Sequence, residues 1–137
     1  MYQQLQHLVV LILIALLGAL PAAAQSGELP ARDRTYVTNL IDLSELIGSA
    51  HAVRVVCNGT QDQFWRSYMQ QLLGLEAPSP GDLRNRMVTA FNSGYQREIA
   101  QLPGCTQDAR DDEAVFSEEG RRLSEALAAH YFPKRGN

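Results

Sequence analysis

The 137-residue chain is poor in lysine and has no excess of positive charge. Twelve Lys and Arg residues stand against 15 Asp and Glu residues, so the formal net charge is −3. Its single lysine is Lys134, and its arginines are scattered except for the neighbours Arg121 and Arg122. Because nonspecific phosphate binding needs a clustered positive excess, the composition argues against nucleic acid as a partner and provides no polybasic patch for a membrane surface.

The sequence also lacks the short motifs of common enzyme and metal chemistries. Ser44 and Ser49 have no G-x-S-x-G context for nucleophilic catalysis. Only two cysteines are present, and the spacing of Cys57 and Cys105 excludes a C-x-x-C redox motif, a C-x-x-C-H haem attachment and a structural zinc site. We therefore expect no cofactor and no metal. Strand-like alternation, internal repeats and low-complexity segments are absent as well.

Long hydrophobic runs are limited to one segment near the amino terminus. Residues 8–20 are apolar and uncharged, and Ala22-Ala23-Ala24 follows as an A-x-A cleavage pattern. These 13 residues fall short of the roughly 20 that span a membrane as a helix. The pattern predicts a signal peptide over residues 1–24, a mature chain of 113 residues and a periplasmic location. The first seven residues contain no Lys or Arg, so an inner-membrane anchor formed by residues 8–24 remains the alternative.

Export bears directly on the two cysteines. In an oxidising compartment an even number of cysteines in a small domain usually forms disulfides, and here Cys57 and Cys105 allow one pairing. Two free buried thiols are the alternative.

Helical periodicity covers most of the mature chain. After a flexible leader over residues 25–34, apolar residues recur at steps of three and four in four segments, each ended by Gly or Pro. We place the helical domain at residues 35–132, with a disordered tail at 133–137. Thr35, Thr60 and Thr106 are candidate helix caps. The expected inward faces are Leu43, Leu46, Ala50, Val53 and Cys57; Phe64, Trp65, Tyr68, Met69, Leu72 and Leu75; Leu83, Met87, Phe91, Gly94, Tyr95 and Leu102; and Ala109, Phe116, Gly120, Leu123, Leu127 and Tyr131.

Short connections make successive helices antiparallel neighbours, so the fold class expected is all-α, an up-down-up-down four-helix bundle. In this topology the ends of the first and third helices lie at the same end of the bundle. Cys57 and Cys105 occupy those two positions, so a disulfide between them is geometrically natural.

Polar residues near this end form the candidate site. His51, Arg54 and Asn58 are spaced three and four apart on the first helix, and Glu98 interrupts an apolar face of the third. At 1.5 Å rise per residue, His51 and Glu98 lie at similar depths below the two cysteines. The binding candidates, for a ligand or a partner, are therefore His51, Arg54, Asn58, Trp65, Asn92, Tyr95 and Glu98.

Three interpretations of this cluster remain open. Arg54 and Glu98 would form a semi-buried structural ion pair, or the cluster would bind a small anionic ligand or a partner's carboxylate beside Trp65. General acid–base catalysis by His51 and Glu98 is the third, although no nucleophile motif accompanies it. The acidic run over residues 111–113 is interpreted as a solvated helix face.

Three segments also resemble a known family. HAVRVVCNG (51–59), DQFWRSYM (62–69) and FNSGY (91–95), followed by Cys105, make the chain similar to an uncharacterised family of small exported alphaproteobacterial proteins, classed as a domain of unknown function. The resemblance covers roughly residues 36–130. It implies an exported helical protein with the two cysteines, and it brings no activity and no catalytic residue.

These observations favour a non-enzymatic protein of the cell envelope that binds another protein or an envelope component. A small anionic ligand binder, or a weak enzyme that uses the His, Arg and Glu cluster, is the alternative. The sequence does not indicate an oligomeric state.

Overall fold

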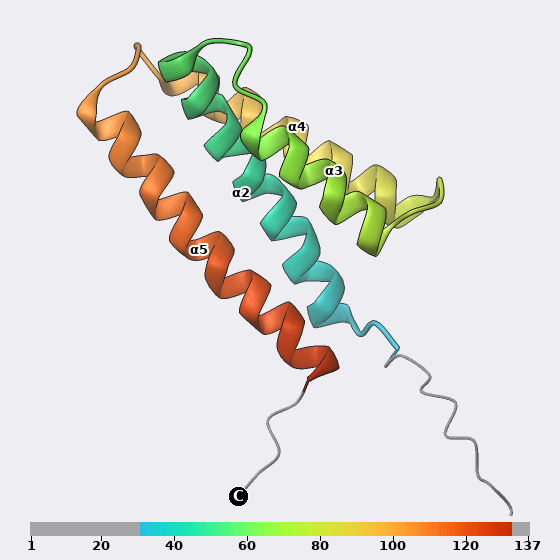
Figure 1. The fold of residues 1–137 in the computed structure, drawn as a ribbon. Helices are drawn as coiled ribbons and strands as arrows, with labels where there is room; N and C mark the ends of the chain where they lie inside the picture. Colours follow the sequence, from blue (N-terminus) through green and yellow to red (C-terminus); the bar gives the residue numbers. More distant parts are fainter. Residues whose placement is uncertain (1–30, 133–137) are drawn as a thin grey trace, which may run out of the picture.

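The computed structural model describes residues 31–132, and this part of the chain is all-α. Four helices pack together, as predicted, and successive helices run in opposite directions (Figure 1). The predicted signal segment 1–24, most of the leader and the tail 133–137 lie outside the described residues. The helices are α2 (Arg34–Asn58), α3 (Phe64–Glu76), α4 (Asp82–Gln101) and α5 (Gln107–Tyr131).

Helix ends follow local chemistry, with two corrections to the expected caps. Asp33 rather than Thr35 caps α2, because its Oδ1 accepts a hydrogen bond from the Tyr36 N–H at 2.7 Å. Thr60 caps nothing, since α3 begins at Phe64. Thr106 caps α5 as predicted, with its Oγ1 3.1 Å from the Ala109 nitrogen.

Helix α2 is the centre of the molecule, and this differs from a bundle with four equivalent corners. Helices α3, α4 and α5 each approach α2, while the backbone of α5 approaches neither α3 nor α4. A single inward stripe was expected on α2, yet every residue from Ile47 to Val53 is buried. A helix enclosed on most sides has this property.

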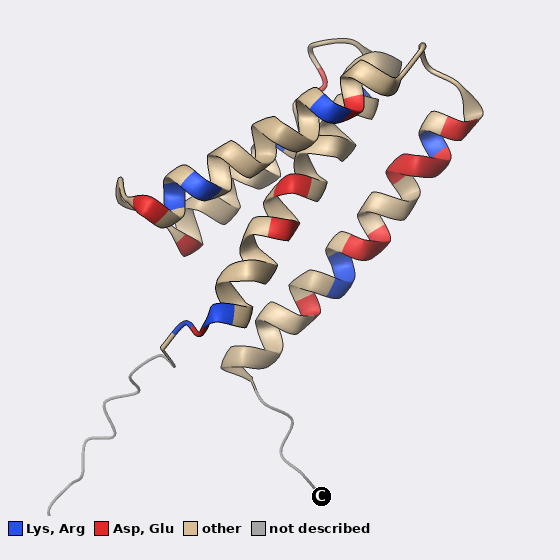
Figure 2. Ribbon diagram, turned by 180° about the vertical axis from the view of Figure 1, so that it is seen from behind, with Lys and Arg blue, Asp and Glu red and all other residues tan. Residues whose placement is uncertain are grey.

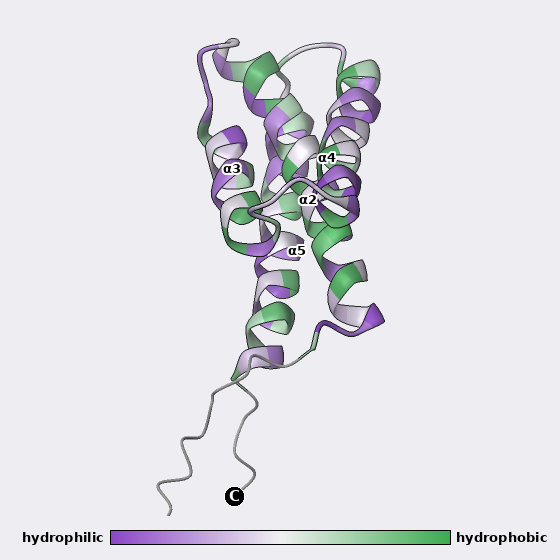
Figure 3. Ribbon diagram, turned by 90° about the vertical axis from the view of Figure 1, so that its right-hand side faces the viewer, coloured by the Kyte–Doolittle hydropathy of each residue, from purple (hydrophilic) through white to green (hydrophobic). Residues whose placement is uncertain are grey.

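The outer helices bury one face each. Hydrophobic and hydrophilic residues alternate along α3 and α5 (Figure 3), as expected of helices that bury one face. The core lies along α2 and consists of Tyr36, Leu40, Leu43, Ile47, Met69, Leu73, Ala77, Met87, Phe91, Leu123 and Leu127. Within the described residues, no helix is both long enough and apolar enough to cross a membrane.

Candidate functional site

The predicted disulfide is present at one end of the molecule. Cys57, in the last turn of α2, is bonded to Cys105 in the connection between α4 and α5. Because this connection precedes α5, the bond fixes the start of α5 next to the end of α2. The polar residues nominated from the sequence lie in the turns below it.

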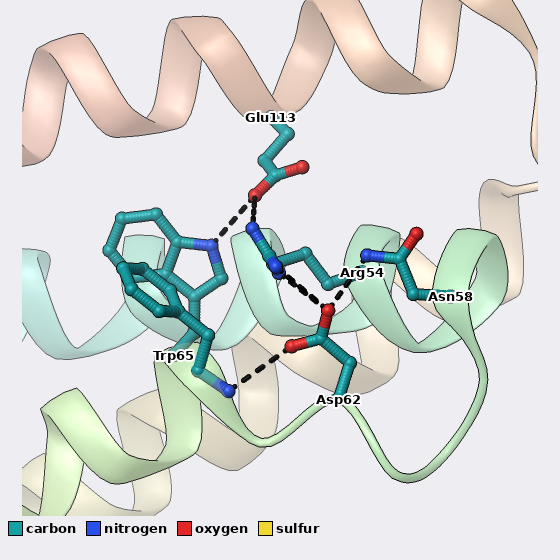
Figure 4. Close-up of polar contacts among 6 residues, drawn as sticks. Arg54, Asn58, Asp62, Trp65 and Glu113 are labelled. Atoms are coloured by element: carbon teal, nitrogen blue, oxygen red, sulfur yellow. Dashed lines mark hydrogen bonds and ion pairs between the residues drawn. The ribbon is translucent and has the colours of Figure 1, made fainter.

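Arg54 is the centre of a polar network beneath the disulfide. Its Nε donates to Asp62 Oδ2 at 2.9 Å, and its Nη2 lies 2.8 Å from the same oxygen (Figure 4). Its Nη1 lies 3.5 Å from Glu113 Oε1 on α5. The guanidinium carbon is also 4.9 Å from the centre of the Phe64 ring, within the range of a cation–π contact. One side chain therefore connects α2, the start of α3 and α5.

Asp62 receives three donors and is held ionised. Besides Arg54, the Asn58 Nδ2 donates to its Oδ2 at 2.7 Å, and the Phe64 N–H donates to its Oδ1 at 3.2 Å (Figure 4). The hydrogen bond from Arg54, followed by that from Asn58, lowers the pKa of the Asp62 carboxyl well below its usual range.

Glu113 is a second residue that the sequence interpretation missed. It belongs to the acidic run assigned to a solvated helix face, yet its Oε1 accepts a hydrogen bond from Trp65 Nε1 at 2.9 Å and faces Arg54 (Figure 4). It is half-buried, whereas the neighbouring Asp111 and Asp112 are exposed. The solvated-face interpretation therefore holds for the two aspartates and is wrong for Glu113.

The expected ion pair between Arg54 and Glu98 is not formed. Glu98 is half-buried and makes no salt bridge within residues 31–132. Burial raises the pKa of its carboxyl, and the negative charge of Asp112 adds to this rise. Arg54 and the contact with α4 lie on different sides of α2. Helix α4 packs against α2 at Gly48. Arg54 is six residues further along, and at about 100° per residue it lies about 120° around the helix from that contact.

His51 takes no part in the Arg54 network and packs against α4 instead. It is 4% exposed, and its ring centre is 5.8 Å from that of Phe91 and 5.5 Å from that of Tyr95. Burial lowers the pKa of its imidazole, and the positive charge of Arg66 lowers it further, while Asp62 acts in the opposite direction. The seven candidates thus fall into separate groups: Arg54, Asn58 and Trp65; His51, Asn92 and Tyr95; and Glu98 alone.

The second group lines a polar hollow between α2, α3 and α4, with a volume of about 390 Å³. Its lining contains one cation, Arg66, and no carboxylate. The residues of this polar hollow are His51, Val55, Thr60, Gln63, Arg66, Phe91, Asn92, Tyr95 and Gln96.

A second, apolar feature lies between α3 and α5, with α2 as its floor. Two adjoining cavities of about 320 Å³ and 210 Å³ share Leu43, Tyr68 and Ser124 and form one elongated groove. Trp65 belongs to its wall, together with the other residues of this α3–α5 groove: Leu46, Ile47, Ala50, Phe64, Phe116, Ser117, Gly120 and Arg121 in the first cavity, and Tyr36, Leu72, Glu76, Leu127, Ala128 and Tyr131 in the second.

Several groove residues had been assigned to the core from their spacing. Phe64, Tyr68 and Phe116 do face inward, but α3 and α5 stay apart, so these rings line an open surface. Phe64 remains 56% exposed. Periodicity identifies the inward face of a helix and does not reveal whether a neighbour covers it.

The two surfaces differ in the groups that they expose. Within residues 31–132, no group of three His, Cys, Asp or Glu residues is placed to hold a metal ion. The groove offers aromatic and aliphatic surface, and the polar hollow offers amides, an imidazole and a guanidinium.

A family model described as a protein of unknown function, DUF2385, matches residues 35–131. The chain belongs to this family. The DUF2385 match begins and ends with the four helices, so it includes both cysteines, the groove and the polar hollow. No curated protein and no solved structure matches the chain.

Proposed function

We propose that this DUF2385 protein is an exported, non-enzymatic protein of the alphaproteobacterial periplasm whose α3–α5 groove binds an amphipathic helix of an envelope protein. The observation that carries the proposal is the groove itself, an elongated apolar surface with the exposed rings of Phe64 and Tyr68 along one wall. Grooves of this kind receive helices through apolar side chains spaced at three and four residues.

The shape of the groove supports a helical occupant. Its floor is a helix, α2, and its walls are two further helices whose backbones do not meet. A helix added between α3 and α5 would cover Phe64, Tyr68 and Phe116 and complete the packing around α2. Aromatic residues in such positions contribute strongly to binding, because they bury a large area with few rotatable bonds.

Charge supports a basic occupant. Helix α5 carries seven carboxylates and three arginines, a net charge of −4, and its acidic residues extend along its length (Figure 2). Arg121, the cation in the groove lining, is neutralised by Glu118 at 2.6 Å and by Glu125. An amphipathic helix with Lys or Arg beside its apolar face would therefore be favoured over an acidic one.

Export is supported by the sequence of residues 1–24 and by the cysteine pair. The protein should begin at Gln25 and be recovered with the periplasmic fraction, and an intact mass measurement tests this. If the protein instead begins at Met1 and is found in the membrane fraction, the amino-terminal segment is an inner-membrane anchor and the proposed periplasmic release is wrong.

The groove is tested with a designed 18-residue helical peptide that carries Leu and Phe on one face and Lys on the flanks. Trp65, the chain's single tryptophan, lies in the groove wall and reports binding by its fluorescence. We expect saturable binding of this peptide and at least about tenfold weaker binding of a matched peptide with Glu in place of Lys. Equal binding of both peptides, or none, would contradict the proposal.

A pair of glycine variants distinguishes a loss of peptide binding caused by filling the groove from one caused by lower protein stability. Gly120→Leu places a side chain in the groove, where a Cβ at Gly120 meets only Leu43 Cδ1 at 3.5 Å. Gly74→Leu makes the same change on α3, where a Cβ meets nothing within 4 Å and no groove is lined. We expect peptide binding to weaken by about tenfold or more in the first variant and to change by less than about twofold in the second.

The occupant in the cell is tested by placing a photo-crosslinking residue at Phe116 and mapping the adduct by mass spectrometry. An adduct on a basic amphipathic segment of another envelope protein supports the proposal. Adducts on residues 8–20 of this chain, on a second copy or on lipid, or no adduct, would overturn it.

A further inference from the structure

We propose that the polar hollow between α2, α3 and α4 is a second binding site, for a small hydroxylated carboxylate of about the size of a hexuronic acid. The proposal does not depend on the α3–α5 groove, because the two surfaces share no lining residue. The hollow is large enough for such a ligand, with a volume of about 390 Å³.

Arg66 supplies the charge that a carboxylate requires. It lines the hollow and makes no ion pair with any residue between 31 and 132, unlike Arg54 and Arg121, which each bind two carboxylates. The hollow's lining contains no Asp or Glu to compete with a ligand. Since a guanidinium binds a carboxylate through two parallel hydrogen bonds, Arg66 is suited to orient one.

His51 is the buried polar group of the site. Its side chain is 4% exposed, it lines the hollow, and its Nδ1 has no hydrogen-bond partner among the described residues. A buried polar atom without a partner is costly, and few occur in a folded protein. Asp62 and Asn58 hydrogen-bond within the Arg54 network, and His51 takes no part in that network.

The other residues that line the hollow favour a ligand with hydroxyl groups over a ligand whose remainder is apolar. Asn92 and Gln96 are exposed amides on α4, and Thr60 adds a hydroxyl beside the start of α3. The His51 ring stacks on that of Phe91 and lies tilted, at 37°, against that of Tyr95. Amide groups donate to and accept from hydroxyls, so this set favours a polyhydroxylated ligand over a bare hydrocarbon carboxylate.

The charges around His51 predict how binding depends on pH. Arg66 on α3 and Asp62 before α3 are the charged groups that act on its imidazole, and Asp62 is already neutralised by Arg54. A bound carboxylate neutralises Arg66 and thereby favours the imidazolium. Affinity is therefore expected to increase as the pH falls through the range in which His51 titrates.

The test is an NMR titration with D-glucuronate, D-glucose as the neutral analogue and inorganic phosphate. We expect glucuronate to cause saturable shifts of three signals: the side-chain amides of Asn92 and Gln96 and the Nε–H of Arg66. Glucose should shift these signals by much less. Equal responses to glucuronate and glucose, tighter binding of phosphate, or no saturable shift would overturn the proposal.

Three variants complete the test. Arg66→Gln removes the cation from an exposed position without an ion partner, so folding should be unaffected, and Arg34→Gln makes the same change at an exposed position that lines no cavity named above. Glucuronate affinity should fall by about tenfold or more in Arg66→Gln and stay within about twofold in Arg34→Gln. His51→Phe retains a ring against Phe91 and Tyr95, and it should remove the pH dependence. Equal affinities of the two arginine variants would contradict the site.

Discussion

Gly48 of α2 and Gly94 of α4 face the opposite helix at a distance that leaves no space for a side chain. A Cβ built on Gly48 would lie 2.0 Å from the carbonyl oxygen of Phe91, and one on Gly94 would lie 2.1 Å from that of Glu45. The Ser49 hydroxyl donates to the Gly94 carbonyl at 3.3 Å in the same contact. Two glycines thus set the spacing between α2 and α4, and with it the position of the polar hollow.

Gly94→Ala is therefore expected to destabilise the protein. The obstacle is the backbone of another helix, which cannot rotate away, so the cost should reach about 3 kcal/mol, the upper end for an overpacked core. Gly74→Ala, where a Cβ meets nothing, should instead stabilise by about 0.5 to 1 kcal/mol through helix propensity. Urea unfolding followed by circular dichroism measures both. A neutral Gly94→Ala would mean that the two helices are farther apart.

Removal of the disulfide should lower stability without loss of helix. Cys57 and Cys105 are separated by 48 positions, and closing a loop of this length stabilises by about 4 kcal/mol in the chain-entropy model. The double serine variant should unfold at a lower urea concentration and keep its helical signal, while the unreduced wild-type protein should show no thiol when denatured. Two titratable thiols in that sample would rule out the bond.

The Arg54 network predicts energetic coupling between α2 and the start of α3. Asp62→Asn should cost about 1.5 to 3 kcal/mol, the range for hydrogen bonds to charged groups, and Arg54→Met a similar amount. The double variant should cost less than the sum, because neither charge is then left without its partner. A double-mutant cycle measures this, with Arg54→Met and Glu98→Gln as the control pair. Additive effects of Arg54→Met and Asp62→Asn would show that these two side chains are not energetically coupled.

Acid should weaken the same network. The folded-state pKa of Asp62 lies below its usual value of about 3.8, so the stability it contributes is fully present above that value and is lost as the pH falls below it. Wild type should therefore lose more stability between about pH 5 and pH 2 than Asp62→Asn does. Urea midpoints across this range test it, and parallel curves for the two proteins would contradict it.

The features that could be predicted from the sequence are those encoded locally or by chain order. Proline and glycine mark the helix ends to within a few residues, and chain order alone brings Cys57 and Cys105 to one end. Gly94 was placed on an inward face, and it lies where α4 comes closest to α2.

The rotation of one helix about its neighbour could not be predicted. Placing Glu98 at the depth of His51, in the same cluster as Arg54, was insufficient, because the contact at Gly48 turns α4 toward a side of α2 that Arg54 does not face. Asp62 pairs with Arg54 instead, since only eight residues separate them and the loop that joins them is short. Periodicity also could not show that α5 stays apart from α3. Because these two helices are separated, Phe64 and Phe116 line a groove instead of a closed core.

Trp65 and Arg66 are adjacent in the sequence, yet the first lies in the wall of the α3–α5 groove and the second in that of the polar hollow. Helix α3 is therefore a partition with a different surface on each side, held at its ends by the pairs Arg54 with Asp62 and Arg32 with Glu76. An occupant that displaces this short helix on one side changes the free energy of occupation on the other. Thermodynamic linkage requires any such change to be equal in both directions.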